Sequence, residues 1–430
     1  MDAPAAAPAA VVAQAPIGII AGGGSLPVEI AESLASRGRR VHIVGITGSA
    51  GPEIEAFPHS WTRIAAIGRL LGSLRAAGCR EIVFVGRITR PDVRALRPDL
   101  GFFRHLPMFF SILRDGDDAI LTRIISFFER QGFTVLGVPE VAPELVARKG
   151  TMGRHAITAE DLADAGIGAK VIAAIGPLDV GQAVVVRRGR VMAIEAAEGT
   201  DRMLARAAEL RGGAADRCGV LVKRPKPGQE LRIDLPAIGP PTIAGAEAAG
   251  LSAIAVAPGG ALLLERARLI AEADARGIAV TGLDAPGAAP DRQVRAVTLD
   301  PVRGRVGRAA ARELALAAEV VARLSDLGCE SAVAVSRGHV LAVSAAEGPV
   351  AMLARVRAQR QWGDAGSSRR RGVTVLGHAG ADCDPAALRD GIDRAGLAAI
   401  AVTSAWPAAA VQQLLDRLPR DVAVSMRRGG

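Results

Sequence analysis

Acidic side chains follow a predicted hairpin in residues 184–201, whose sequence is VVVRRGRVMAIEAAEGTD. Two short β-type runs flank Gly189, which can adopt the positive φ that a tight hairpin turn requires. The second run leads into Glu195, Glu198 and Asp201. Glu198 and Asp201 are about one helical turn apart and are candidate metal ligands. Glu195 is expected to be an exposed carboxylate without a ligand role.

A second polar stretch, residues 222–239, reads VKRPKPGQELRIDLPAIG. It carries Lys223, Lys226 and Asp234 between prolines that stiffen the backbone. Ammonium and carboxylate groups on rigid strand ends suit a phosphorylated ligand and a divalent metal ion. We expect the two lysines to neutralise phosphate charge and Asp234 to bind a metal or orient a water molecule. The alternative for Asp234 is a turn-forming aspartate before Leu-Pro.

Lysine is rare in this chain, with four lysines among 53 basic residues. A lysine retained where arginine fills nearly every other basic position is informative, because its compact point charge differs from a planar guanidinium. All four fall between residues 149 and 226, and the clustering favours a phosphate or metal site in this region. The four are Lys149, Lys170, Lys223 and Lys226.

The composition indicates a folded chain of two or three domains, with 430 residues of which half are apolar and 23% are charged. The net charge of +9 fits either an anionic membrane surface or an arginine-rich solvated surface. Aromatic residues make up 3% and tyrosine is absent, so no nucleic-acid partner is expected. The dispersed cysteines favour a reducing compartment, and no apolar run reaches the roughly 18 residues that span a bilayer.

A glycine-rich loop, AGGGSLP, follows the short apolar strand predicted at residues 17–20. A strand, a glycine loop, a helix and a second strand open a doubly wound parallel sheet, which predicts a Rossmann-like domain over residues 17–145. Gly22, Gly23 and Gly24 would bring backbone amides close to a phosphate at a helix N-terminus. The spacing departs from GxGxxG, and a tight turn without a ligand is the alternative.

A second α/β domain is predicted over residues 150–283. A turn ending at Gln182 precedes the hairpin, and a helix with orphan amides begins at Thr200 or Asp201. We expect Gln182 and Thr200 to bind polar groups of a ligand. Helices are expected at 159–175, 200–210, 242–249 and 262–276, strands at 254–257 and 278–283, an irregular stretch at 92–106 and a linker at 284–291.

The C-terminal third repeats the second domain. Residues 332–356 align with residues 183–207 at an offset of 149, and 15 of the 25 positions are identical. A third domain, residues 301–430, is therefore predicted as a degenerate copy of the second. The copy keeps the apolar pattern but loses the charged positions, because Ser344 stands in place of Glu195 and Val350 in place of Asp201. The lysine and proline segment has no counterpart.

Long motifs in the first 283 residues resemble one family throughout. AGGGSLP, LRDGDDAIL, LDVGQAVVVRRGRV, EAAEGTD, VKRPKPGQ and RIDLPAIGPPT occur in order. They are similar to the I-type UDP-2,3-diacylglucosamine pyrophosphatases of lipid A biosynthesis. The resemblance implies a Rossmann-like domain, a distinct C-terminal domain and Mg²⁺-dependent hydrolysis of UDP-2,3-diacylglucosamine to 2,3-diacylglucosamine 1-phosphate (lipid X) and UMP. It also implies that Asp234, in the family's (D)LP motif, is the essential aspartate.

Two departures from the family pattern stand out, namely Glu230 in place of an expected aspartate and the appended copy. The alternatives are a non-catalytic nucleotide-sugar or lipid-binding protein and, from the glycine loop alone, a nicotinamide oxidoreductase. The missing GxGxxG spacing weighs against the latter. Because the substrate carries acyl chains, we expect a cytoplasmic protein peripheral to the inner membrane. The copy is expected to fold without catalysing and to cover a face otherwise used for homo-oligomerisation.

Overall fold

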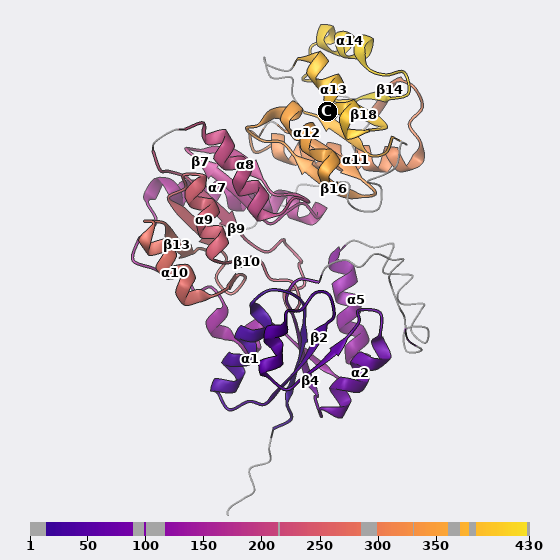
Figure 1. The fold of residues 1–430 in the computed structure, drawn as a ribbon. Coiled ribbons are helices and arrows are strands. Elements are labelled where there is room, and N and C mark those ends of the chain that lie inside the picture. The colour runs from indigo at the N-terminus through magenta and orange to yellow at the C-terminus, as the bar shows by residue number, and fades with distance from the viewer. Residues whose placement is uncertain are drawn as a thin grey trace, which may run out of the picture. The chain divides into compact units, whose positions relative to one another are not determined.

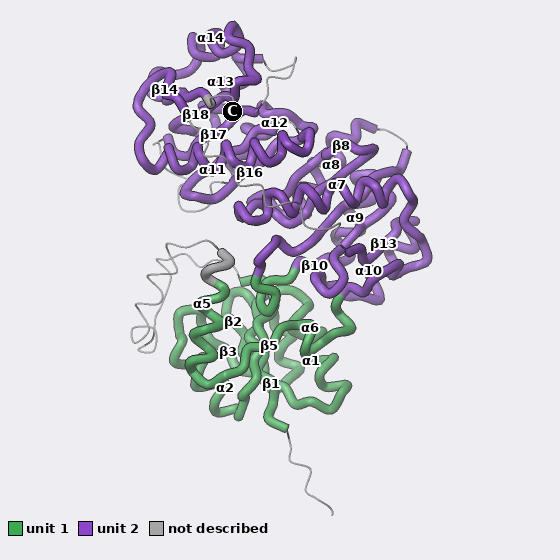
Figure 2. Tube along the Cα trace, turned by 180° about the vertical axis from the view of Figure 1, so that it is seen from behind, with its two compact units in different colours: residues 1–146, 230–235 green, residues 147–229, 236–430 purple. Residues whose placement is uncertain are grey.

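A computed structural model describes residues 14–88, 99, 117–213, 216–284, 299–329, 331–359, 370–377 and 384–427. The chain forms two compact units, shown in Figure 2: unit 1 contains residues 1–146 and 230–235, and unit 2 contains residues 147–229 and 236–430. The predicted stretch 92–106 and linker 284–291 fall almost entirely outside the described residues. Within the described ranges, no helix is both long enough and apolar enough to cross a membrane.

Unit 1 is built on a five-stranded parallel sheet with strand order β3-β2-β1-β4-β5. Its strands are short, and β1 and β2 at its centre are largely buried, as the apolar runs in the sequence predict. The order reverses between β1 and β4, and this is the topological switch point of a doubly wound sheet. The elements are β1 (Ile17–Ala21), α1 (Leu26–Ser36), β2 (Val41–Ile46), β3 (His59–Thr62), α2 (Ile67–Ala76), β4 (Glu81–Val85), α5 (Asp117–Arg130), β5 (Thr134–Leu136) and α6 (Val138–Val141).

Helices cover both faces of this sheet, with α1 on one side and α2 and α5 on the other (Figure 1). The α2 and α5 side is closed by an apolar cluster that includes Leu74, Ile82 and Phe128. Each of these helices carries an apolar stripe at helical spacing, which is why it packs on the sheet. The Rossmann-like fold predicted for this part of the chain is confirmed.

A short return segment, residues 230–235, belongs to unit 1 rather than to the unit that flanks it in sequence. Ile233 packs against the apolar cluster beneath α2 and α5. Arg232 pairs with Glu230 at 2.9 Å and with Glu129 of α5 at 3.1 Å. These contacts fix the segment that carries Asp234, and the continuous second domain predicted over 150–283 is interrupted here.

The first part of unit 2 is a six-stranded mixed sheet with order β6-β13-β11-β9-β7-β8. The predicted hairpin and the 159–175 helix are confirmed. Residues 262–263 were predicted to be helical but form a short strand. They pair in parallel with Ala237 and Ile238 of β10, and this pairing holds the two leucines in an extended conformation. The elements are β6 (Gly150–Thr151), α7 (Ala159–Ile175), β7 (Ala183–Arg187), β8 (Arg190–Ile194), α8 (Thr200–Arg211), β9 (Val220–Lys223), β10 (Ala237–Ile238), α9 (Pro240–Ala248), β11 (Ala253–Val256), β12 (Leu262–Leu263), α10 (Arg266–Ala275) and β13 (Ala279–Gly282).

The last part of unit 2 is a second six-stranded sheet with order β14-β19-β18-β17-β15-β16. Strand by strand, its parallel and antiparallel pairings are those of the first sheet. The elements are β14 (Leu299–Arg303), α11 (Arg308–Ser325), β15 (Ala332–Ser336), β16 (His339–Val343), α12 (Gly348–Gln359), β17 (Val373–Leu376), α13 (Pro385–Ala395), β18 (Ala399–Val402), α14 (Ala408–Arg417) and β19 (Ala423–Arg427).

Local details recur in the two sheets as well. The β7–β8 turn places Arg188 and Gly189 at positive φ, and the β15–β16 turn does the same with Arg337 and Gly338. Asp164 accepts a hydrogen bond from Gly189 N at 2.7 Å, and Glu313 accepts one from Arg337 N at 2.6 Å. A turn with two residues at positive φ matches the twist of a two-residue hairpin. Both turns are thus held to the helix beneath by a buried or half-buried carboxylate.

One face of each sheet is covered by a single helix, α7 on the first and α11 on the second. The opposite faces pack against α8, α9 and α10, and against α12, α13 and α14. The two single-helix faces share one apolar cluster, which runs from β7 and α7 through α11 to β15. The appended sheet is therefore joined to the first sheet through α7 and α11.

Candidate functional site

Polar side chains of unit 2 gather at one edge of the first sheet. Lys223 is the last residue of β9, Glu195 follows β8, and Gln182 precedes β7. Because β7 is antiparallel to both β8 and β9, its beginning lies beside their carboxyl ends. Thr200 opens α8 at the same edge. The register of the strands therefore brings Gln182, Glu195 and Lys223 together, and the start of α8 adds Thr200.

A continuous hydrogen-bond chain joins them. Lys223 Nζ donates to Thr200 Oγ1 and to the carbonyl oxygen of Ala237, both at 2.8 Å. The Thr200 hydroxyl donates to Glu195 Oε1 at 2.6 Å, and Glu195 Oε2 accepts from the backbone N–H of Gln182 at 2.8 Å. Lys223, Thr200 and Glu195 are all buried. An ammonium and a carboxylate are held in a low-dielectric environment with a hydroxyl between them, and this arrangement strengthens each bond.

The chain of contacts continues into the loop after β9. Gln229 Nε2 lies 3.4 Å from Gln182 Oε1, and Gln229 Oε1 accepts from Lys226 N at 2.8 Å. Lys226 Nζ in turn contacts the carboxylate of Asp179, which has a left-handed backbone at φ 55°. The structure thus brings together four predicted ligand-binding residues, Gln182, Thr200, Lys223 and Lys226, and adds Glu195, Gln229 and Asp179 to them.

Backbone approach beside Glu195 is unusually close. A Cβ atom added at Gly181 would lie 2.3 Å from the carbonyl oxygen of Glu195. Only glycine fits such a distance, and it allows Gln182 N to reach the Glu195 carboxylate. The LDVGQ motif therefore has a structural reason for its glycine.

The expectation that Glu195 is exposed is wrong, because its side chain is buried by the bonds from Thr200 and Gln182. The repeat held a signal for this role. Ser344, at the same position of the copy, accepts a hydrogen bond from Ala332 N at 2.6 Å and so satisfies only a backbone group. The two positions therefore differ in their contacts, because Ser344 accepts from one backbone group whereas Glu195 accepts from a backbone group and from the Thr200 hydroxyl.

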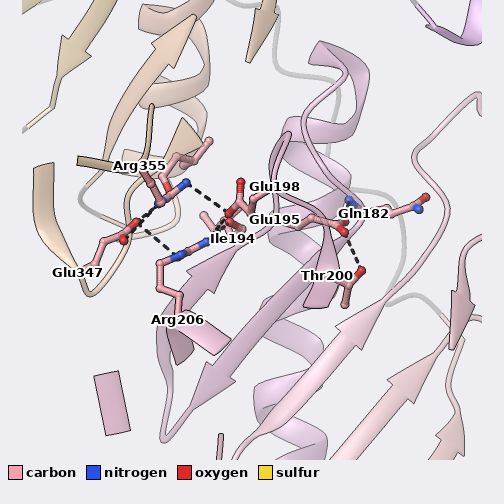
Figure 3. A network of polar contacts seen from close by, with 9 residues as sticks. Gln182, Ile194, Glu195, Glu198, Thr200, Arg206, Glu347 and Arg355 are labelled. Atoms are coloured by element: carbon pink, nitrogen blue, oxygen red, sulfur yellow. Dashed lines mark hydrogen bonds and ion pairs between the residues drawn. The ribbon is translucent and has the colours of Figure 1, made fainter. Parts of the chain in front are cut away.

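Glu198, a predicted metal ligand, forms ion pairs with two arginines. Its carboxylate accepts a hydrogen bond from Arg206 at 2.6 Å and lies 3.3 Å from Arg355, and its side chain is 2% exposed (Figure 3). Two guanidinium groups within ion-pair distance account for the burial of this charge. The prediction is therefore revised: Glu198 anchors two parts of unit 2, and no metal role is retained for it.

The remaining carboxylates give little support to a metal centre of side chains. Asp201 is exposed in the first turn of α8, where a negative charge complements the helix dipole. Among the residues that the structure describes, no group of three or more His, Cys, Asp or Glu side chains lies together in a way that would hold a metal ion. The described donor set does not fit a protein-built metal cage, and we derive no chemical step through one.

The glycine loop lies at the switch point of the unit 1 sheet, but its first amides are engaged. Gly22 N donates to Val85 O at 2.8 Å and Gly23 N to Arg87 O at 2.7 Å. A Cβ at Gly22 would lie 2.5 Å from Arg87 O, so close loop packing explains this glycine. The predicted phosphate contact through the amides of Gly22 and Gly23 therefore loses its donors. Gly24 is at φ 99° with open space around its Cβ position, and a phosphate contact through its backbone amide stays a prediction.

Asp234 is half-buried in the return segment of unit 1, where its backbone N–H donates to Glu230 O at 3.1 Å. Its place near Leu-Pro in a turn agrees with the turn-forming alternative, and its role as the essential aspartate stays a prediction. The departure noted at Glu230 is accounted for locally. The guanidinium of Arg232 binds the Glu230 carboxylate and lowers the pKa of that carboxyl.

Among its described residues, the second sheet of unit 2 has no counterpart of this hydrogen-bond chain. From the matching registers, Leu376 occupies in the second sheet the position that Lys223 has in the first, and it lies in an apolar cluster. Pro349 stands at the position of Thr200 and Ser344 at that of Glu195. The same sheet edge is present without the ammonium, the hydroxyl and the carboxylate.

Fold and site together define an α/β protein with a Rossmann-like first unit and a lysine-containing polar network at one sheet edge of its second unit. The LpxI N-terminal domain model matches residues 16–145 and the LpxI C-terminal domain model matches residues 148–281. The chain belongs to the LpxI family. A relative from Caulobacter vibrioides, named UDP-2,3-diacylglucosamine pyrophosphatase LpxI, is 42% identical over 272 residues, which are 62% of this chain and 97% of the relative.

Proposed function

We propose that this protein hydrolyses the pyrophosphate bond of UDP-2,3-diacylglucosamine in lipid A biosynthesis. Water attacks one phosphorus atom, the phosphoanhydride P–O bond breaks, and the products are UMP and 2,3-diacylglucosamine 1-phosphate. The observation that carries this proposal is the 42% identity to a relative of that name over both family domains. These domains hold the Lys223 network and Asp234.

Lys223 is the leading candidate to stabilise negative charge on a phosphoryl group. Its ammonium is buried and oriented by Thr200 and Ala237, so it is fixed before a ligand arrives. Preorganised positive charge in a site of low dielectric is worth more than the same charge in water. Glu195 acts through Thr200 as a positioning residue. Lys226 and Gln182 are proposed to bind polar groups of the substrate.

We propose Asp234 as the residue that orients the attacking water. The support is its match to the essential aspartate of the family motif and its fixed place between Ile233, which packs against an apolar cluster, and buried Leu235. Replacing Asp234 by alanine is expected to lower turnover at least roughly a hundredfold, the scale of losing one catalytic group. Near-normal turnover would remove Asp234 from the mechanism.

A requirement for Mg²⁺ is also proposed, from the family resemblance. An excess of chelator is expected to abolish UMP release, and added Mg²⁺ is expected to restore it. Zinc and calcium at equal concentration serve as comparison ions. Full activity in excess chelator would exclude the requirement, and no residue role above depends on it.

Residues 301–430 are proposed to be a degenerate copy of the second domain. Support comes from the shared strand order, the paired hairpin turns and the 15 identities in 25 aligned positions. The losses of Lys223, Thr200 and Glu195 in the copy predict that it does not hydrolyse the substrate. UMP release by a chain with an intact copy but with Lys223→Met and Asp234→Ala would contradict this.

Reversible membrane binding is proposed because the substrate of the family carries acyl chains and the chain has a net charge of +9. We place the protein at the cytoplasmic face of the inner membrane. It is expected to co-sediment with vesicles containing anionic lipid at low salt and to be released at high salt. An absence of co-sedimentation even at low salt would contradict the proposal.

The direct test of the function is incubation of purified protein with UDP-2,3-diacylglucosamine and Mg²⁺, followed by detection of UMP. Stoichiometric UMP and 2,3-diacylglucosamine 1-phosphate are expected. Saturable binding of the substrate without any product would favour the alternative, a non-catalytic nucleotide-sugar or lipid-binding protein.

A further inference from the structure

Four buried charged side chains join the two halves of unit 2 in a symmetric arrangement. Glu198 lies 3.3 Å from Arg355, and Arg206 lies 3.4 Å from Glu347. Within each half, Arg206 also binds Glu198 at 2.6 Å and Arg355 binds Glu347 at 2.5 Å. Figure 3 shows the four groups facing one another. All four are at most 18% exposed.

The numbering of these pairs reveals the symmetry. Glu347 and Arg355 stand 149 positions after Glu198 and Arg206, the same offset as the sequence repeat. The contact from Glu198 to Arg355 is therefore the two-fold counterpart of the contact from Glu347 to Arg206. In an isologous interface, residue i of one partner contacts j of the other, and j contacts i in return. The contact between the halves has this property.

The helices at the interface obey the same rule. The bounds of α7, Ala159–Ile175, shifted by 149 give 308–324, and α11 spans Arg308–Ser325. α7 packs against α11, so each helix meets its own counterpart. Arg323 donates at 2.8 Å to the carbonyl oxygen of Ala174, which is the residue 149 positions before it. A contact between equivalent positions is expected at a two-fold axis.

Apolar burial agrees with a real interface. α7 contributes Ala165, Ala169 and Ile172 to the shared cluster, and the matching positions of α11 contribute Leu314, Ala318 and Val321. Since α7 already covers its own sheet, a second apolar neighbour leaves it buried on two sides. Exposing this face would uncover apolar surface and would remove one of the two ion-pair partners of Glu198 and of Arg206.

We propose that residues 299–430 are an internal partner that occupies a self-complementary dimer interface of the preceding domain. The occupant of that face, when the appended copy is absent or repelled, is a second copy of this chain. Glu198 of one chain would pair with Arg206 of the other, and the reverse, in place of Arg355 and Glu347. The relative from Caulobacter matches this chain over 97% of its own length, so little of it remains to supply an appended copy. The proposal is independent of the hydrolase activity.

The full chain carries the first test. Glu347→Arg combined with Arg355→Glu places like charges opposite Arg206 and Glu198. The face of the preceding domain that carries Glu198 and Arg206 is left unchanged. The wild-type chain is expected to be monomeric by light scattering at micromolar concentration, and this variant to be dimeric. A folded variant, judged by circular dichroism, that stays monomeric would overturn the proposal, as would a wild-type chain that dimerises through this face.

A charge-swap rescue separates specific pairing from damage. Adding Glu198→Arg and Arg206→Glu to the variant restores opposite charges across the internal contact, and the monomer is expected to return. Persistent dimerisation of the fourfold variant would contradict the assigned pairs. As a matched surface control, the exchange of exposed Arg268 and half-buried Glu272, an ion pair on α10, is expected to leave the monomer unchanged.

Truncation after Asp291 gives a second test, which does not require that the Glu347→Arg, Arg355→Glu variant folds. Most of the Caulobacter relative corresponds to this part alone, which supports independent folding of the shortened chain. The truncated chain is expected to dimerise. Arg206→Glu in the truncated chain is expected to raise the Kd of the dimer at least roughly tenfold. Combining Glu198→Arg with Arg206→Glu is expected to restore the dimer. A monomeric truncated chain, or a dimer indifferent to Arg206→Glu, would overturn the proposal.

Discussion

The ammonium of Lys223 lies 2.8 Å from the hydroxyl oxygen of Thr200, and both side chains are buried at the carboxyl edge of the first sheet of unit 2. This contact fixes the direction of the hydroxyl hydrogen. Because the ammonium can only donate, the hydroxyl must accept from it and donate onward to Glu195. A positive charge is thereby held in place by neighbours rather than by solvent.

Removing this charge is predicted to reduce hydrolysis. Lys223→Met keeps most of the side-chain volume but cannot donate to Thr200 or to Ala237 O. We expect kcat/KM for UDP-2,3-diacylglucosamine to fall by about 10²- to 10³-fold, the range for losing one preorganised charge-stabilising donor. The measurement is UMP release under steady-state conditions. Lys149→Met is the control, because Lys149 is exposed and pairs with exposed Asp284. Equal losses in both variants would contradict the assignment.

Glu195 is predicted to act by positioning. Glu195→Gln preserves the shape but leaves one acceptor oxygen for two donors, the Thr200 hydroxyl and the backbone N–H of Gln182, so one of these two bonds is lost. We expect kcat to fall by about tenfold to a hundredfold with a smaller change in KM, and Glu195→Asp to recover part of it. Ser344→Ala, at the same position of the appended copy, should leave both constants unchanged. An unchanged kcat in Glu195→Gln would remove this residue from the site.

The buried ion network is predicted to be sensitive to loss of one partner. Arg206→Ala leaves the nearly buried carboxylate of Glu198 with fewer positive neighbours, and such deletions cost about 3–5 kcal/mol of unfolding free energy. Arg268→Ala, which removes exposed ion pairs on α10, should cost less than about 1 kcal/mol. Urea denaturation monitored by circular dichroism compares the two. Similar losses in both would contradict a buried network.

The Glu230 carboxyl gives a pH dependence with a definite sign. Its hydrogen bond from Arg232 lowers the folded-state pKa below the ordinary value of a glutamate. The stabilisation is therefore present above the unfolded-state pKa, about 4.3, and is lost as pH falls through the folded-state value. Glu230→Gln should lower stability at pH 7 by less than about 1 kcal/mol, and the difference should shrink as the pH falls below the unfolded-state pKa. A destabilisation that persists at low pH would indicate a different cause.

Much of this fold follows from local sequence signals. Apolar runs and the glycine loop predict the parallel sheet of unit 1, and the β-type runs around Gly189 predict the hairpin whose turn adopts positive φ. The helix at 159–175 was predicted to the residue. Leu262 and Leu263 were assigned wrongly, because the strand they pair with lies 25 residues earlier and no local pattern reveals it.

The site was predictable in its residue types but not in its pairings. The scarcity of lysine indicates a role for Lys223, and the family motif indicates a role for Asp234. The burial of Glu195 depends on a backbone approach at Gly181 and on the register of three strands. The ion pairs of Glu198 depend on Arg355, which lies in another domain. Contacts of this kind arise from tertiary packing, so a periodicity argument does not find them.

Release of UMP from UDP-2,3-diacylglucosamine by the purified full chain tests the central claim most directly. The account predicts product formation by the wild-type chain in the presence of Mg²⁺. It also predicts a loss of about 10²-fold or more in Lys223→Met with folding retained. A wild-type chain that binds the substrate but releases no UMP, or a Lys223→Met variant as active as the wild type, would contradict it.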